Sequence, residues 1–552
     1  MADFLSTSVS GLSSVQRALD VLSHNISNAY TEGYTRQSVT LATRVPQYTG
    51  QGAVGTGTAL VDISRAFDQF LGQTLQTALT EQGRLQARSD LLGRVEDALG
   101  DDTNNMSTWM MDFFNAAQDL SNNPSDTALR TALLGQAENL VSQAQNLDRR
   151  FSDIETSVAR QFSQITTEIN GYTKELANLN ASIRDIRNKF PDQQPNDLLD
   201  RRDLILRKLA ENVDISTFQD GEGNINVTLG NGDWLVLSDR QNPLVAAPTG
   251  TGFKVLVQEK GTTRDITDQL AGGKLGGLVR AKQDVLDPLR AELGRLVFSF
   301  ASAVNDQHAL GEDLDGNAGT YDFFKVSGLP LNTFVGDPKV EPSASGVTMS
   351  ITNVSELTAS DFRLKYVGGQ WNLYKVGNDT PLVQGLTGTY AVPGEGITID
   401  ASSLPATPGA GDATEILVRP MGGVLSALDV DITDPRAIAA AGVGVGPGDN
   451  SNIRAWSNIA NSAGQVAGQF SLSGAYANTL VAFGSEARAT NVSLEAQDLY
   501  VKQTSDRREA VVGVNLDEEA AELVRLQNHY MALSKSVSVA DTLFQSLLQA
   551  AA

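Results

Sequence analysis

The sequence predicts a mainly α protein with an inserted β-rich domain, in which the N- and C-terminal helices pair as a coiled coil beside a long α-helical bundle. Three observations predict this class. Apolar residues recur every seven positions at both ends of the chain, helical periodicity continues through long internal stretches, and the period changes to two in the middle region. A helix with one narrow apolar stripe cannot bury that stripe alone, so we expect the two ends to pack together and to meet further subunits.

The terminal helices carry the heptad rows that predict this pairing. The first helix is expected from Ala2 to Asn28, and its row consists of Leu5, Leu12, Leu19 and Ile26. The start of the last helix is marked by the capping-box spacing of Asn515 and Glu518. Its two rows consist of Leu516, Leu523, Tyr530, Val537 and Phe544, and of Leu526, Leu533, Ala540 and Leu547.

Between the ends, the pattern alternates between helix and strand. Glycines mark an irregular segment over 29–57, and the helical pattern resumes near Asp62. The expected internal helices cover about 62–100, 109–124, 126–190, 278–308 and 452–506. The longest of them ends at Phe190, because the residue before a proline is pushed out of the helical region. The expected hairpin turns are Asn231-Gly232 and Gly368-Gly369, each between alternating apolar residues.

This pattern predicts three domains. The first is a terminal coiled-coil domain with a motif loop, built from 1–57 and 507–552. The second is a long-helix domain from 58–319 and 431–506, which contains a small β subdomain at about 213–258. The third is a β-rich outer domain over 320–430.

The bulk composition excludes several kinds of function. The chain of 552 residues has a net charge of −23 and no cysteine. Because nucleic acids and anionic membranes are bound by clustered Lys and Arg, we expect neither as a partner. The lack of cysteine removes disulfides and thiolate chemistry. No apolar run approaches the ~18 residues of a membrane-spanning helix, and no cleavable signal peptide is recognisable.

No residue pattern predicts catalysis or a bound cofactor. The three histidines, at 24, 308 and 529, do not have the spacing of metal ligands. The glycine-rich stretch 442–446 lacks the Lys-Ser/Thr of a phosphate-binding loop. We therefore expect no enzyme activity, no cofactor and no metal.

The segment that follows the first apolar stripe is the most unusual local feature of the sequence. Asn28 can end a helix and Gly33 can supply a left-handed turn, so a helix stop followed by a turn accounts for both residues. That simple interpretation does not account for the whole set, which also includes Asn25, Thr31, Tyr34 and Arg36.

The string Asn25-Ile-Ser-Asn28, then Thr31, then Gly33-Tyr34, resembles the N-terminal signature of the axial proteins of the bacterial flagellum. This family comprises rod, hook and hook-associated proteins. Ser27 stands where the family pattern has alanine. The continuation 34–37, the stretches 275–278 and 304–316, and the start of the last helix over 514–520 resemble the hook-associated members most.

The resemblance implies a structural protein, not an enzyme, at the junction between the flagellar hook and filament. It implies self-assembly through the terminal helices into a ring, with the hook protein below and a second junction protein and the flagellin side above. It further implies an export chaperone on the C-terminal helix and an extracellular location in the flagellum, reached by type III export without a cleavable signal peptide. The alternatives are a flagellar hook protein, a secreted coiled-coil adhesin or effector, and an enzyme within the β-rich insert.

Overall fold

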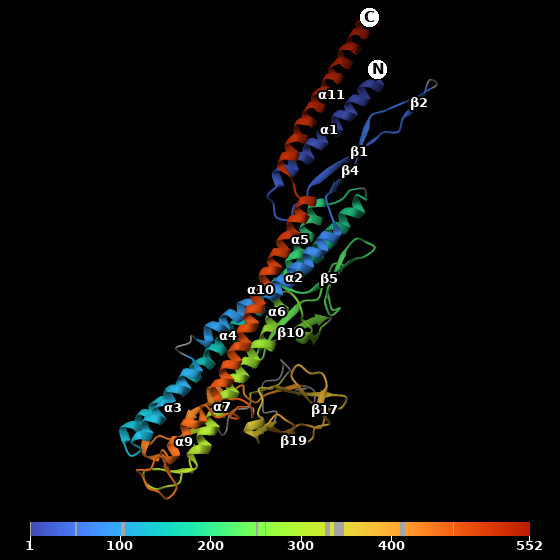
Figure 1. Cartoon of the computed structure of the whole chain (residues 1–552). Helices are drawn as coiled ribbons and strands as arrows, with labels where there is room; N and C mark the ends of the chain where they lie inside the picture. The colour runs from blue at the N-terminus through green and yellow to red at the C-terminus, as the bar shows by residue number, and fades with distance from the viewer. Residues whose placement is uncertain are drawn as a thin grey trace.

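The computed structural model describes residues 2–49, 52–100, 105–191, 193–249, 252–259, 261–325, 332–335, 347–408, 415–466 and 468–551. It forms an elongated shaft of long helices, with both termini at one end and a β-rich domain attached to the side near the other end (Figure 1). The terminal helices α1 (Ala2–Asn28) and α11 (Leu516–Ala551) lie side by side. The predicted fold class, including the pairing of the two ends, is confirmed.

A β-hairpin follows α1 and packs along it. β1 (Gln37–Thr43) pairs antiparallel with β4 (Thr58–Arg65), and β2 (Gln47–Thr49) pairs with β3 (Gly52–Val54) towards the tip. The expected irregular segment is confirmed for 29–36 but was wrong where β1, β2 and β3 lie, and a helix start near Asp62 was also wrong, because Asp62 lies in β4. Short polar strands give a weak period-two signal, and these gain their support from α1, a contact that local patterning does not reveal.

The shaft consists of long helices, most of which were predicted. Its members are α2 (Gln69–Leu99), α3 (Met106–Asn122), α4 (Thr127–Lys189), α5 (Asn196–Asn212), α6 (Gly273–Ala281), a π-helical turn η2 (Lys282–Leu286), α7 (Asp287–His308), α8 (Val424–Ala427), α9 (Ser451–Ile459) and α10 (Leu472–Val512). The single helix expected over 452–506 was wrong, because the structure has two helices there, Ser451–Ile459 and Leu472–Val512. α4 starts at its cap Asp126, whose side chain accepts hydrogen bonds from two backbone amides, and it ends before Phe190 as expected. Phe151, Phe162 and Ile169 of its heptad rows are fully buried.

The small β subdomain packs against α4. Its strands are β5 (Ile215–Gln219), β6 (Ile225–Leu229), β7 (Trp234–Leu237), β8 (Arg240–Gln241), β9 (Leu244–Thr249), β10 (Gly252–Glu259) and β11 (Thr262–Asp265). They form one sheet of order β5-β6-β7-β8 and one of order β11-β10-β9. The hairpin expected at Asn231-Gly232 joins β6 to β7. Phe162 of α4 stacks on Phe253 of β10, with 3.7 Å between the ring centroids.

The outer domain contains two antiparallel sheets in its described residues, of orders β14-β21-β16-β17-β18 and β15-β20-β19. The strands are β14 (Asn332–Val335), β15 (Thr348–Ile351), β16 (Phe362–Val367), β17 (Gln370–Lys375), β18 (Pro381–Gln384), β19 (Thr389–Val392), β20 (Ile397–Asp400) and β21 (Glu415–Arg419). β16 and β17 form the hairpin expected around Gly368-Gly369. Residues 326–331, 336–346 and 409–414 of the expected domain lie outside the described residues.

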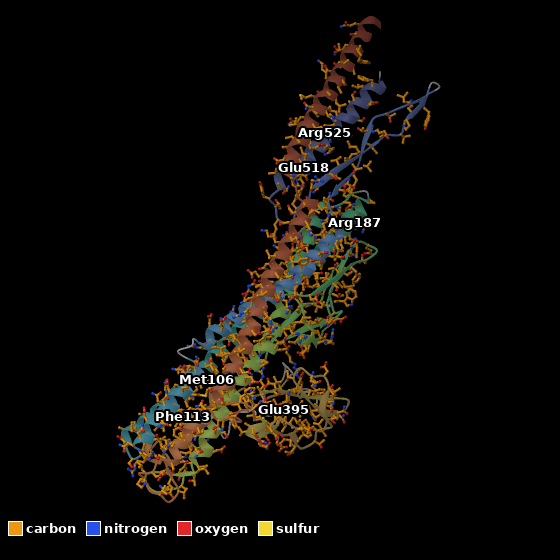
Figure 2. All side chains as sticks on the ribbon, in the orientation of Figure 1. Met106, Phe113, Arg187, Glu395, Glu518 and Arg525 are labelled. Atoms are coloured by element: carbon orange, nitrogen blue, oxygen red, sulfur yellow. The ribbon has the colours of Figure 1, made fainter. Side chains whose placement is uncertain are left out.

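Two short strand pairs and an aromatic cluster join the outer domain to the far end of the shaft. The pairs are β12 (Gly311–Glu312) with β23 (Ala441–Gly442) and β13 (Phe324–Lys325) with β22 (Asp429–Val430). Phe113, labelled in Figure 2, has its ring centroid within 5.9 Å of that of Phe114 in the same helix and of those of four further aromatic side chains. These are Phe300, Phe323, Phe324 and Trp456. The cluster ties α3, α7 and α9 to the stem of the outer domain.

Candidate functional site

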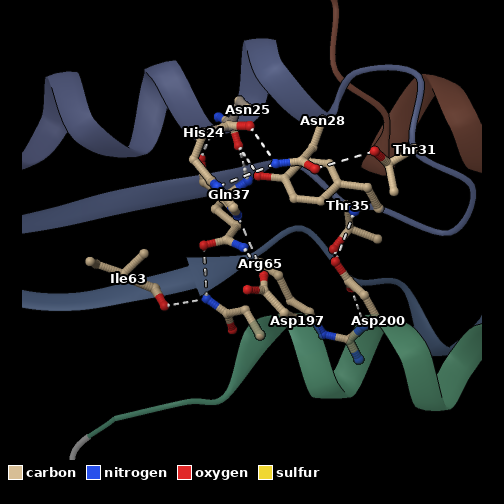
Figure 3. Close-up of polar contacts among 12 residues, drawn as sticks. His24, Asn25, Asn28, Thr31, Thr35, Gln37, Ile63, Arg65, Asp197 and Asp200 are labelled. Carbon is tan, nitrogen blue, oxygen red and sulfur yellow. Dashed lines mark hydrogen bonds and ion pairs between the residues drawn. The ribbon is translucent and has the colours of Figure 1, made fainter.

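Asn25, the first residue of the motif, lies in the last turn of α1, and its side chain is fully hydrogen-bonded. Its amide nitrogen donates to the backbone oxygen of Gln37 at 2.9 Å and to the carboxylate of Glu519 at 3.1 Å. Its oxygen accepts from the Tyr34 hydroxyl at 2.7 Å and from the Gln37 backbone amide at 2.9 Å. With only 2% of its surface exposed, Asn25 connects α1 to the motif loop and β1 (Figure 3) and, through Glu519, to α11.

The motif loop is folded by its own short side chains. Asn28 donates to the backbone oxygen of His24 at 3.0 Å and accepts from the Thr31 hydroxyl at 3.2 Å, which closes the end of α1. Gly33 has a φ of 88°, and a Cβ added there would lie 3.2 Å from Leu204 in α5. The position therefore needs glycine both for its backbone conformation and for the close approach of the loop to the shaft.

Tyr34 lies between the terminal helices and the shaft. Burial raises the pKa of its hydroxyl above the ordinary value of 10.0, and the carboxylates of Asp197, Asp200 and Glu519 add to the rise. The hydroxyl therefore keeps its proton and serves as a donor to Asn25. The ring also meets His24 edge to face, with 5.5 Å between the centroids.

A second set of contacts fixes the loop to α5, and no motif residue from the sequence analysis predicted it. Asp200 accepts from the backbone amide of Thr35 at 3.0 Å and from the Thr35 hydroxyl at 2.6 Å. Arg65 at the end of β4 reaches the same carboxylate at 2.7 Å, and it lies 2.7 Å from Asp203 as well. The side chains of Arg65 and Asp200 are each 7% exposed, so this ion pair is largely shielded from water.

Gln37 completes the connection to the shaft. Its side chain donates to Asp197 at 3.0 Å and accepts from Asn196 at 3.4 Å, while Asn196 also donates to the backbone oxygen of Ile63 at 2.8 Å. We call the whole set the hub; it consists of Asn25, Tyr34, Thr35, Gln37, Arg65, Asn196, Asp197, Asp200 and Glu519. Its α5 members carried no sequence signal, because single polar residues on an amphipathic helix look like a solvated face.

Arg36 links the loop to the end of α10 and to the start of α11. Its backbone amide donates to the backbone oxygen of Val512 at 2.8 Å, and its guanidinium donates to Glu518 at 3.2 Å. Glu518 therefore pairs with Arg36. The side chain of Asn515, just before α11, accepts a hydrogen bond from the backbone amide of Asp517 at 3.0 Å. The ion pair is solvent-exposed, so it contributes less than the buried contacts of the hub.

The heptad rows of the terminal helices are only partly covered within one chain. Leu526 is buried; Leu12, Leu19, Ile26, Leu523, Leu533 and Val537 are half-buried; Leu5, Leu516, Tyr530 and Phe544 are exposed. Leu547 lies in α11, but its side chain is outside the described residues. Ser8, Val15 and Leu22 form the most buried heptad row of α1, which sequence analysis missed because the row begins with a serine.

The geometry of the hub serves positioning. Its carboxylates are occupied by arginine, threonine and amide donors, and it connects the terminal helix pair to the shaft. Among the described residues, no group of three or more His, Asp or Glu is placed to hold a metal ion. In the same part of the chain, the helices lack an apolar stretch long enough to cross a membrane.

Comparisons with protein families match both ends and the middle of the chain. Residues 5–35 match the family described as "Flagella basal body rod protein". Residues 92–324 match "Flagellar hook-associated protein FlgK helical domain". Residues 510–550 match "Flagellar basal body rod FlgEFG protein C-terminal". The two terminal matches contain most of α1 with most of the motif loop, and most of α11.

Individual proteins match along nearly the whole chain. The structure of the flagellar hook junction protein FlgK from Burkholderia pseudomallei has the same fold, with a TM-score of 0.70 at 23% identity, and covers 80% of this chain and 100% of that one. Flagellar hook-associated protein 1 of Escherichia coli K12 is 30% identical over 99% of this chain and 100% of its own length. The Salmonella typhimurium protein of the same name is 31% identical with the same coverage. The chain therefore belongs to the flagellar hook-associated protein 1 family.

Proposed function

We propose that this flagellar structural protein forms the junction between hook and filament, and that its copies associate through the terminal helices into a ring. The observation that carries the proposal is the uneven cover of those helices. The hub holds them firmly on the shaft, yet Leu5, Leu516, Tyr530 and Phe544 stay exposed in the single chain. A coiled-coil seam that one chain leaves open is completed by neighbouring chains.

The motif residues then have a positioning role. Asn25, Asn28, Thr31, Gly33, Tyr34 and Arg36 set the angle between the terminal helix pair and the shaft through the contacts of the hub. A fixed angle matters in a ring, because every subunit must offer its neighbours the same surface for the rotation to close. A protein at such a joint needs no catalytic group and no cofactor, and we propose none.

The partners follow from the place of such a ring. We propose contacts with further copies of this chain, with the hook protein below, and with a second junction protein and the flagellin side above. An export chaperone is proposed for the C-terminal helix, because its exposed apolar residues need cover before assembly. We further propose type III export to the cell exterior.

We also propose a division into three domains. The terminal helices with the motif loop form the first, the long helices with the small β subdomain form the second, and the β-rich residues 320–430 form an outward-facing third. Because β1 pairs with β4, the expected boundary at residue 57 falls inside the hairpin, so we place it after Arg65.

Electron microscopy of cells that lack this protein tests the proposal. Hooks without filaments, with filament subunits released into the medium, are the expected result. Restoring the wild-type chain should restore filaments, and a chain with Leu526→Asp in the buried seam should not. Cells that lack hooks entirely would instead support the hook-protein alternative, and normal filaments would overturn the junction role.

A further inference from the structure

A line of seven charged side chains crosses from the shaft into the outer domain, and the proposed function does not use it. Acidic and basic groups alternate along the line, in the order Asp148, Arg290, Glu155, Lys282, Asp287, Arg419 and Asp361. Their side chains are between 8% and 18% exposed, so the whole line is largely shielded from solvent. We call it the charge line.

The shaft supplies the first five members. Asp148 and Glu155 lie seven residues apart on one face of α4, and Arg290 of α7 bridges them at 2.6 and 3.0 Å. Lys282 of the π-helical turn lies 3.5 Å from Glu155 and 2.6 Å from Asp287 at the start of α7. The π-helical turn thus places a lysine between two helices that pack against each other.

The outer domain supplies the last two members from its base. Asp361 precedes β16 and Arg419 ends β21, and these strands pair with Phe362 opposite Val418. Arg419 donates to Asp287 at 2.5 Å across the boundary between shaft and domain, and its Nε lies 3.2 Å from Asp361. Arg419, a cation between two buried carboxylates, therefore adds a charged contact between the outer domain and the shaft.

The line holds four acids and three bases, so it has one negative charge too many when every group is ionised. A buried charge without a full partner is costly, and the more weakly paired end of the line bears that cost. At one end, Asp148 accepts two hydrogen bonds from Arg290, at 2.6 and 3.2 Å, whereas the acid at the other end has one contact, to Arg419 at 3.2 Å. That group is Asp361, which faces Arg419 of β21 and, from the shaft, Asp287 and Lys282. A proton on Asp361 leaves three acids and three bases in strict alternation.

We propose that the charge line is a proton-dependent brace: with Asp361 protonated it holds the outer domain at one angle on the shaft, and ionisation of Asp361 loosens that hold. Burial raises the pKa of Asp361 to about 7; Arg419 opposes the rise and Asp287 adds to it. The pKa of Asp287 moves the other way, because Lys282 and Arg419 outweigh its burial and lower it below 3.8. Of these two carboxyl groups, only that of Asp361 changes charge near neutral pH.

The sign follows from the raised pKa. Protonated Asp361 favours the docked arrangement, and this contribution is lost as the pH rises through about 7. A second set of ion pairs keeps the loosened domain close to the small β subdomain. Arg363 lies 2.9 Å from Asp268, and Glu415 lies 3.6 Å from Lys254. The brace thus controls how widely the angle between the outer domain and the shaft varies, and it does not decide whether the domain stays attached.

Distance measurements between two spin labels on the full chain test the brace. Because the chain has no cysteine, Thr156→Cys on α4 and Thr387→Cys on the outer domain take the labels at these two exposed positions alone. The distance distribution should be narrow at pH 6.5 and at least twofold broader at pH 8.5. Asp361→Asn, which is neutral at both pH values, should keep it narrow at both.

Two further variants make the result decisive. Asp379→Asn removes an exposed carboxylate of the outer domain and should respond to pH like the labelled parent chain. Arg419→Gln removes the cation between the two carboxylates and should give the broad distribution at both pH values. Equal widths at pH 6.5 and 8.5 in the parent chain, or an unchanged pH response in Asp361→Asn, would overturn the brace.

Discussion

The side-chain amide of Asn25 in α1 donates a hydrogen bond to the carboxylate of Glu519 in α11, joining residues 494 positions apart at 3.1 Å. The same side chain also holds Tyr34 and Gln37. The pairing of the two chain ends and the folding of the motif loop are therefore one structural event, and damage to one should appear in the other.

Asn25→Asp tests this coupling with the smallest change of shape. The new carboxylate cannot donate to Gln37 or Glu519, and it adds a negative charge beside Glu519. We expect the terminal helix pair to lose about 2–4 kcal/mol of local stability, as for a buried polar group left without its partner. Amide hydrogen exchange across α1 measures the loss as faster exchange.

The matched control is Asn528→Asp, which adds the same charge at an exposed position of α11. It should leave exchange in α1 within a factor of two of the wild type. If Asn25→Asp also left exchange unchanged, Asn25 would not be the link between the two ends.

Gly33→Ala tests the close approach of the motif loop to α5. Its left-handed backbone and the 3.2 Å approach of an added Cβ to Leu204 both oppose a side chain. We expect a loss of about 1–3 kcal/mol in the stability of the hub, because the αL conformation and the crowding both carry a cost. Amide hydrogen exchange of Thr35 and Gln37, followed at increasing denaturant concentration, measures this loss of stability.

The same substitution is expected to raise stability at Gly93, an exposed position inside α2 where an added Cβ meets nothing within 4 Å. Gly93→Ala should stabilise α2 by about 0.5–1 kcal/mol through helix propensity. A Gly33→Ala variant as stable as the wild type would show that the loop can move away from α5.

The helices could be predicted because their signal is local and repeated. Asp126 and Pro191 bound a pattern of many turns, so the ends of α4 were expected almost to the residue. The β1–β4 hairpin could not be predicted, since Ser10 and Ser14 of α1 supply part of its support through contacts to Thr58. Such contacts depend on chain folding and leave no periodic trace.

The candidate site likewise contains residues that could be predicted from the sequence and residues that could not. The motif loop was recognised from its residues, because Asn25 to Arg36 form a contiguous string. Asp200 and Arg65 were missed, since each is a single charge in an amphipathic element and their 2.7 Å contact brings β4 to α5. A residue whose partner lies 135 positions away can be identified only once the fold is known.

His308 should make the stem of the outer domain sensitive to acid. It is fully buried, its Nδ1 lies 2.9 Å from the backbone oxygen of Tyr321, and its Nε2 accepts from the backbone amide of Ala439 at 3.0 Å. Burial lowers the pKa of His308 below 6.5, so below that pH the unfolded chain binds the extra proton more readily. Stability should therefore fall as the pH drops below about 6.5.

Thermal unfolding between pH 7.5 and 5.5 measures this effect, and His308→Gln isolates it. The glutamine does not titrate, so the variant should be less stable at pH 7.5 but should lose less on acidification. Asp361 has the opposite effect on stability over this pH range, but it is present in both the variant and the wild type, so its effect cancels in the comparison. His529→Gln, at an exposed position of α11, should keep the wild-type slope. Equal slopes in His308→Gln and the wild type would show that His308 does not titrate in this range.

Leu533→Asp separates assembly from folding. Leu533 lies against Gly11 of α1, where an added Cβ would come within 3.2 Å of its side chain. A carboxylate placed in this contact should lower the stability of the helix pair by roughly 2–4 kcal/mol, as for other polar groups that lose water without gaining a partner. The buried core clusters of the shaft and outer domain contain no residue of α1 or α11. Circular dichroism should therefore show these parts folded, while the variant fails to restore filaments to cells that lack the protein. Ser534→Asp adds the same charge at the next, exposed position and should restore them. Full restoration by Leu533→Asp would mean that the pairing of α1 with α11 within one chain is not needed for the subunits to associate.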